Sequence, residues 1–107
     1  MGSVRGHWFL VVPLATAGWD PRPRIETPTP WHDYGSAAYY HAPPTPQELA
    51  QHLQAALDWL KAHPQTAVAN AVLIYAWNEF DEGGWLATTL AEGAARLDAI
   101  QGVLSKR

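Results

Sequence analysis

The chain has 107 residues, a formal net charge of −3 and no cysteine, and 48% of its residues are hydrophobic. This length fits one domain, and the lack of cysteine excludes disulfide scaffolds, thiolate metal sites and cysteine nucleophiles. The few lysines and arginines are scattered and no stretch approaches roughly 18 apolar residues, which argues against a nucleic-acid-binding protein and against a membrane-spanning helix.

The first predicted element is a strand over residues 7–14, a continuous run of aromatic and β-branched residues. Such a run is typical of a strand buried on both faces of a parallel sheet. Residues 5–17 also resemble a secretory signal, because Arg5 precedes the run and Ala15-Thr16-Ala17 has the form of a cleavage site. Since Pro13 interrupts the run, we favour the strand, and with it a cytoplasmic protein.

Residues 18–46 are predicted to form a long irregular loop, because prolines and glycines recur throughout. Loops of this length inside a compact domain are usually functional. Six tryptophans in so short a chain indicate either an aromatic core or a surface that stacks on flat polar molecules such as sugars. The aromatic residues and histidines of this loop are Trp19, Trp31, Tyr34, Tyr39, Tyr40, His32 and His41.

Two helices and a second strand are predicted beyond this loop. The capping box Thr45-Pro46-Gln47-Glu48 predicts a helix with one leucine stripe that ends at Pro64. The apolar run 71–77 predicts another buried strand, and the capping box Thr89-Leu90-Ala91-Glu92 predicts the last helix. Alternating strands and helices predict an α/β fold with parallel strands, in a single domain over residues 1–107. The expected buried stripe of the last helix is Leu90, Ala94, Leu97, Ile100 and Leu104.

An acidic segment, Asn78-Glu79-Phe80-Asp81-Glu82-Gly83-Gly84, directly follows the second predicted strand. Ligands and catalytic groups gather at the carboxyl ends of parallel strands. Cleavage of a glycosidic bond needs a carboxylic acid to protonate the leaving oxygen and a carboxylate to assist at the sugar. Glu79 and Glu82 are the candidate catalytic pair. The alternative is a solvated acidic loop before a helix N-terminus, where negative charge is favourable.

Three motifs occur in order along residues 10–100: Gly18-Trp19-Asp20-Pro21-Arg22-Pro23-Arg24, Pro44-Thr45-Pro46-Gln47-Glu48-Leu49 and Ala76-Trp77-Asn78-Glu79-Phe80-Asp81-Glu82-Gly83-Gly84-Trp85-Leu86. Together they resemble the C-terminal part of the glycoside hydrolase family 99-like group, which includes WbsX-type domains named as glycosyltransferases. The resemblance implies that the chain forms two βα units, the C-terminal quarter of a (β/α)₈ barrel. The chain departs from the group at Leu86-Ala87-Thr88, where relatives usually have Leu-Glu-Pro.

The resemblance also implies an activity and a set of site residues. It implies retaining cleavage of glycosidic bonds, in which Glu79 acts through the sugar 2-hydroxyl and Glu82 is the general acid/base. Substrate binding would fall to Asn78, to the ring-stacking candidates Trp77, Trp85 and Trp19, and to Asp20, Arg22 and Arg24, which would contact hydroxyl or carboxylate groups.

We expect a carbohydrate substrate and neither a metal nor a cofactor, because the histidines lack the spacing of metal sites. A (β/α)₈ barrel needs about 250 residues, so we expect copies of this chain to supply the missing strands in a homo-oligomer. Two alternatives stay open. One is a carbohydrate-binding or structural fragment without catalysis, and the other is a glycosyltransferase-like role in polysaccharide assembly.

Overall fold

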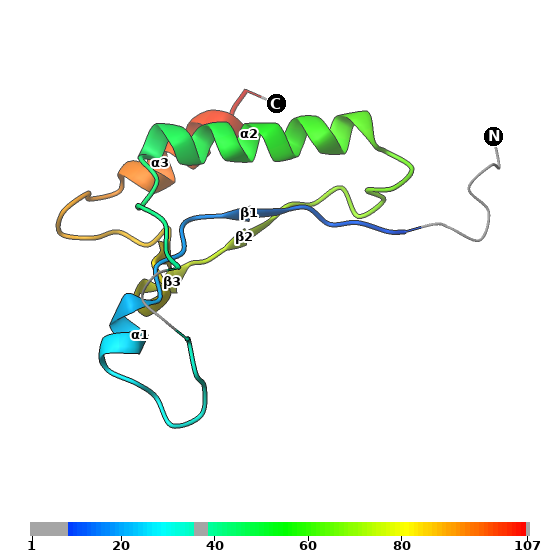
Figure 1. The fold of residues 1–107 in the computed structure, drawn as a ribbon. Coiled ribbons are helices and arrows are strands. Elements are labelled where there is room, and N and C mark those ends of the chain that lie inside the picture. The colour runs from blue at the N-terminus through cyan, green and yellow to red at the C-terminus, as the bar shows by residue number, and fades with distance from the viewer. Residues whose placement is uncertain (1–8, 36–38, 107) are drawn as a thin grey trace.

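The computed structural model of the protein describes residues 9–35 and 39–106. Figure 1 shows an L-shaped arrangement, in which helices cover a pair of strands in one arm and a short helix with its following loop forms the other. The mixed α/β class predicted from the sequence is confirmed. The elements are β1 (Leu14–Thr16), α1 (Arg22–Glu26), α2 (Pro46–Ala62), β2 (Leu73–Tyr75), β3 (Asn78–Glu79), the 3₁₀ turn η1 (Phe80–Glu82), β4 (Gly84–Trp85) and α3 (Ala95–Leu104).

The strands β1 and β2 pair in parallel, with Leu14 opposite Leu73 and Thr16 opposite Tyr75. Parallel pairing was predicted, but both strands are shorter than the apolar runs 7–14 and 71–77. Asn70 adopts a left-handed φ of 50°, so a turn delays the start of β2. Beyond Tyr75 the chain leaves β1 and enters a separate hairpin. The start of the first predicted strand, including His7, lies outside the described residues.

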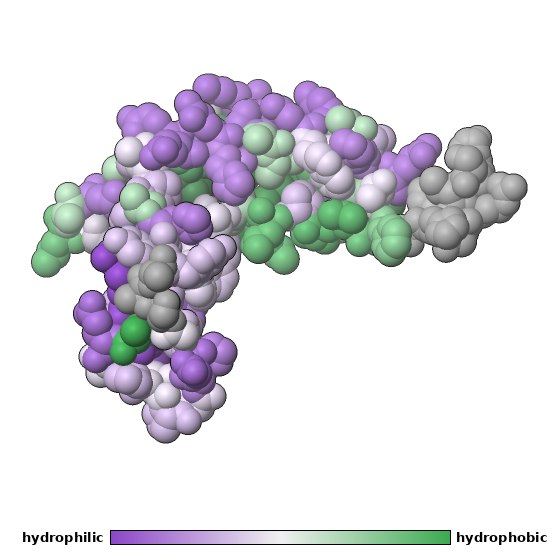
Figure 2. Space-filling model, in the orientation of Figure 1, coloured by the Kyte–Doolittle hydropathy of each residue, from purple (hydrophilic) through white to green (hydrophobic). Residues whose placement is uncertain are grey.

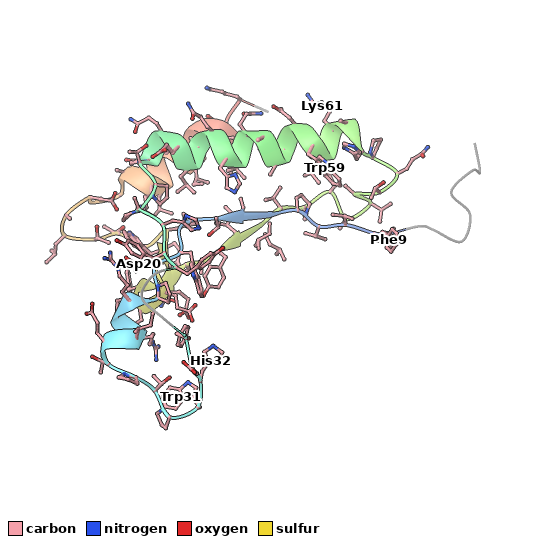
Figure 3. All side chains as sticks on the ribbon, in the orientation of Figure 1. Phe9, Asp20, Trp31, His32, Trp59 and Lys61 are labelled. Carbon is pink, nitrogen blue, oxygen red and sulfur yellow. The ribbon has the colours of Figure 1, made fainter. Side chains whose placement is uncertain are left out.

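Helix α2 supplies most of the core, through Leu49, Leu53, Leu57 and Leu60. It begins at the predicted capping box: the Glu48 amide donates to Thr45 Oγ1 at 3.1 Å and the Thr45 amide donates to Glu48 Oε1 at 2.9 Å. Each bond satisfies an amide that the first helical turn would otherwise leave without a partner. Trp59 packs against the edge of this core, as predicted, and lies on the strand side of α2 in Figure 3.

Within the described residues, the β1–β2 pair is covered on one face only. Successive strand side chains point to opposite faces. Ala15 is buried, whereas its neighbour Leu14 and the partner Leu73 are 61% and 60% exposed. Figure 2 shows the resulting apolar band beneath the helices. The prediction that these strands are buried on both faces is therefore wrong for this chain by itself, since no second layer covers Leu14 and Leu73.

The last helix begins later than the capping box predicted. The Glu92 amide does donate to Thr89 Oγ1, at 3.1 Å, but Gly93 then adopts a left-handed φ of 59° and pairs with Thr89. This turn prevents the helix from starting at Thr89, and α3 starts at Ala95. Leu90 is fully exposed, and Ala94 and Leu104 are exposed as well, so their predicted places in the buried stripe are wrong. The buried apolar residue of α3 is Val103.

The segment 18–46 is not irregular throughout, because Arg22–Glu26 forms α1. Pro21 and Pro23 flank the first helical position, where a missing amide hydrogen leaves no bond unmade. The prolines and glycines predicted an irregular loop, but proline also favours the first turn of a helix, and a short helix forms here. In the part of the chain that the structure describes, no helix is both long enough and apolar enough to cross a membrane.

Candidate functional site

The acidic segment forms a small folded hairpin, where the sequence predicted a loop. Strands β3 and β4 pair antiparallel, with Glu79 opposite Gly84, and η1 connects them. Gly83, with a φ of 76°, makes the left-handed turn that ends η1. Glu79 therefore lies on a strand, whereas Asp81 and Glu82 lie on the turn beside it.

The turn after β1 packs directly on this acidic turn. The Asp20 amide donates to the Glu82 carbonyl at 2.6 Å. A Cβ atom on Gly83 would lie 2.6 Å from the Asp20 amide nitrogen, so only glycine allows this approach. The two sequence motifs that the resemblance singled out as site segments are thus in contact, although they are far apart in the chain.

Two tyrosine hydroxyls hold the Glu82 carboxylate. Tyr75 donates to Oε1 and Tyr34 donates to Oε2. Tyr75 is the last residue of β2, whereas Tyr34 comes from the loop after α1. Sequence reasoning missed both partners as site residues. The position of Tyr75 at the carboxyl end of a predicted parallel strand was a usable signal, but no pattern distinguished Tyr34 from the other aromatic residues of its loop.

Glu79 lies on β3, just before the turn that carries Glu82. It lines an open hollow of about 330 Å³ together with Arg24, Asn78, Phe80 and Asp81. The hydrogen bond to Glu82 raises the pKa of Tyr34, with smaller contributions from partial burial and from the negative charges of Glu82 and Glu79. The two glutamates predicted to work together therefore both influence one tyrosine hydroxyl.

Removing the Glu82 charge should lower the pKa of Tyr34 toward the usual tyrosine value of about 10. The raised pKa means that this interaction favours folding at pH values below the unfolded tyrosine pKa, and that its contribution disappears as the pH rises through the folded one. Spectrophotometric titration of tyrosinate in wild type and Glu82→Gln measures the change. Tyr34→Phe identifies the transition, and an identical Tyr34 titration in both proteins would contradict the assignment.

The two arginines of α1 are already paired with carboxylates. Arg22 binds Asp20 through two nitrogens, at 2.9 Å and 2.8 Å, and this hydrogen bonding lowers the pKa of Asp20. The Arg22 guanidinium also lies 3.7 Å from the centre of the Tyr40 ring. Arg24 Nε lies 3.0 Å from Asp81 Oδ2, within ion-pair distance but outside hydrogen-bond geometry. Of these pairs, only Arg24 with Asp81 lies in the hollow with Glu79.

The three tryptophans predicted to stack on sugar do not gather at one place. The Trp85 ring lies 4.0 Å from the Arg96 guanidinium and its indole N–H donates to Glu92 at 3.3 Å. Trp19 lines a different hollow, of about 290 Å³, beside α2. Trp77 is 56% exposed just before β3. Trp85 thus packs on Arg96 and Glu92, whereas Trp19 and Trp77 lie at two other places, so the three rings do not form one stacking surface.

Arg96 connects the segments that carry the site, and its side chain is only 2% exposed. Its Nη1 donates to the Ala17 carbonyl at 3.0 Å and to the Trp85 carbonyl at 2.9 Å, and its Nη2 donates to the Pro44 carbonyl at 3.2 Å. Its Nε donates to Glu92 at 3.0 Å. Sequence reasoning missed Arg96, because an arginine four residues after a glutamate is typical of an exposed helical ion pair.

No family profile, curated protein or solved structure matches the chain in the three comparisons. Glu82 accepts two hydroxyl hydrogen bonds, and Glu79, on the strand just before it, lines an open hollow. Carboxylates can exchange protons with a molecule bound beside them.

Proposed function

We propose that the chain cleaves glycosidic bonds, with Glu82 as general acid/base and Glu79 assisting at the sugar 2-hydroxyl. The observation that carries the proposal is the position of Glu82, held by the Tyr34 and Tyr75 hydroxyls on the turn that directly follows Glu79 of β3. Carboxyl groups at the carboxyl edge of parallel strands are the usual equipment of glycosidases built on (β/α) folds. Asn78 lies in the hollow with Glu79 and is the residue best placed to bind a sugar hydroxyl there.

In this proposal the two tyrosine hydroxyls stabilise the Glu82 carboxylate that forms when Glu82 has given up its proton. Protonated Glu82 gives its proton to the oxygen of the leaving sugar, and the resulting carboxylate accepts both hydroxyl hydrogen bonds. In the same step Glu79 accepts the proton of the 2-hydroxyl, whose oxygen bonds to the sugar carbon and displaces the leaving group. Water then attacks that carbon and breaks this new bond, Glu82 takes up a proton of the water, and Glu79 returns its proton to the 2-oxygen. A hydroxyl both donates and accepts, so either tyrosine can also accept from Glu82 when it is protonated.

The same proposal includes a (β/α) barrel of which this chain forms a part. The parallel pair β1–β2, with α2 between them in the chain and packed on one face, has the form of a unit of a (β/α) barrel. Leu14 and Leu73 would then face the barrel interior. Further copies of the chain would supply the remaining strands and cover these side chains, which isolated domains rarely leave exposed together.

The test is hydrolysis of aryl glycosides and neutral oligosaccharides by wild type and by Glu82→Gln. Loss of a general acid/base typically costs a factor of about 10²–10⁴, so we expect kcat to fall at least about a hundredfold. Glu26→Gln, which removes an exposed carboxylate at the end of α1, is the matched control and should keep full activity. Cleavage that survives Glu82→Gln unchanged would overturn the assignment.

A carbohydrate-binding fragment without turnover remains the second candidate. One observation favours it: both Glu82 carboxylate oxygens are occupied by protein hydroxyls. Binding of arrayed sugars without any cleavage would select this candidate. A glycosyltransferase-like role in polysaccharide assembly would instead show as transfer of the sugar to an acceptor glycan in place of water.

A further inference from the structure

A third hollow, of about 430 Å³, lies between α1 and the loop that follows it. We call it the Trp31 hollow, because Trp31 lines it and is 75% exposed. His32 and Tyr34, which also line it, meet edge to face with their ring centres 4.4 Å apart. Figure 3 shows Trp31 and His32 at the far end of the α1 arm. No sequence motif or resemblance assigned a role to these aromatic residues.

The loop around the Trp31 hollow is held in shape by its own contacts. Thr29 and His32 form an antiparallel bridge, and Thr29 Oγ1 donates to the His32 carbonyl at 3.4 Å. The Gly35 amide donates to Asp33 Oδ1 at 2.8 Å. A preformed wall loses little conformational freedom when a ligand binds, so exposed rings on it can stack at low cost.

Two residues connect the Trp31 hollow to the proposed catalytic carboxylates. The Tyr34 ring lines the hollow while its hydroxyl donates to Glu82. Arg24 lines both the Trp31 hollow and the hollow that contains Glu79. A chain of sugar rings that places one linkage at Glu82 therefore has an aromatic surface available for a neighbouring ring.

We propose that the Trp31 hollow is a subsite for a neighbouring sugar ring of the glycan that is cleaved at Glu82, with Trp31 as the stacking surface. This inference rests on the proposed function and adds the class of substrate. The sugar faces of hexoses stack on indole rings, and the polar atoms at the rim of the hollow suit hydroxyl groups.

Charge restricts the substrate to uncharged sugars. Among the described residues, Arg24 is the only arginine that lines the Trp31 hollow or the hollow with Glu79, and it lies within ion-pair distance of Asp81. The carboxylates of Asp33, Glu79 and Glu82 line these hollows or contact their walls. A uronic acid or a sulfated sugar would meet this excess of negative charge and be disfavoured, so the preferred glycan is neutral.

The test is binding of an array of neutral, uronic-acid and sulfated oligosaccharides to the full chain, compared for wild type, Trp31→Ala and Trp31→Phe. We expect neutral oligosaccharides of two or more residues to bind best, Trp31→Ala to weaken them about fivefold to tenfold, and Trp31→Phe to keep most of the affinity. Tyr39→Ala, which removes another exposed ring that does not line the hollow, is the matched control.

The outcomes separate this inference from the proposed function. Equal binding by wild type and Trp31→Ala overturns the subsite, as does a preference for acidic oligosaccharides, even if Glu82-dependent cleavage is observed. Conversely, Trp31-dependent binding of neutral oligosaccharides supports the subsite even if Glu82→Gln leaves cleavage unchanged. An array on which nothing binds overturns the subsite.

Discussion

Replacing Arg96 with methionine should reduce the free energy of unfolding by about 3–5 kcal/mol, since breaking a buried ion pair leaves its partners uncompensated. The side chain is 2% exposed and donates to Glu92 and to three backbone carbonyls. Methionine has a similar length but no donor, so the buried Ala17 carbonyl and the partly buried carbonyls of Trp85 and Pro44 would lose this hydrogen-bond partner. Urea unfolding measures the effect, with an expected midpoint shift of about 2 M.

The contacts of Arg96 are specific to a planar guanidinium, so the lysine variant is informative. Arg96→Lys keeps the charge but cannot reach three segments at once, and we expect it to recover less than half of the loss. Lys61→Met, an exposed cation on α2 that points away from the strands in Figure 3, should change the midpoint little. A small effect of Arg96→Met, equal to that of Lys61→Met, would show that Arg96 does not hold these segments together.

Local sequence signals predicted the parts of the fold that depend on neighbouring residues. The start of α2 was predictable because Thr45 and Glu48 satisfy each other's amides within one turn. The start of α3 was not, because the same pattern at Thr89 competes with the left-handed turn at Gly93, and the turn prevails. Parallel pairing of β1 and β2 followed from the alternation of elements, whereas strand length depended on contacts beyond the apolar runs.

The candidate site was predictable only in part, for a related reason. Glu79 and Glu82 stand out in the sequence because they follow a predicted strand. Tyr75 could have been singled out by its place at the end of the same strand, seven residues before Glu82. Tyr34 could not, because it is 48 residues from Glu82 in the chain and only the packing of its loop brings the hydroxyl there. Arg96 is likewise visible only once its distant carbonyl partners are known. Long-range contacts with single polar groups leave no periodic pattern in a sequence.

Glycine is required where the turn after β1 packs on the acidic turn that carries Glu82. Gly18 has a φ of 131°, and a Cβ atom on it would collide with the Gly83 carbonyl and lie 3.3 Å from Pro44 Cδ. Gly18→Ala should therefore separate the turn after β1 from the acidic turn and break the hydrogen bond from the Asp20 amide to the Glu82 carbonyl. Backbone strain and overpacking together predict a loss of about 3–5 kcal/mol in the free energy of unfolding.

Gly102→Ala is the matched control for this prediction, because a Cβ atom there meets nothing within 4 Å and the residue lies inside α3. Alanine favours a helix over glycine, so this variant should gain about 0.5–1 kcal/mol. If Gly18→Ala lowers the free energy of unfolding and Gly102→Ala raises it, glycine is required specifically where the turn after β1 packs on the acidic turn. Equal stabilities of Gly18→Ala and wild type in urea unfolding would contradict the close packing on which the position of Glu82 depends.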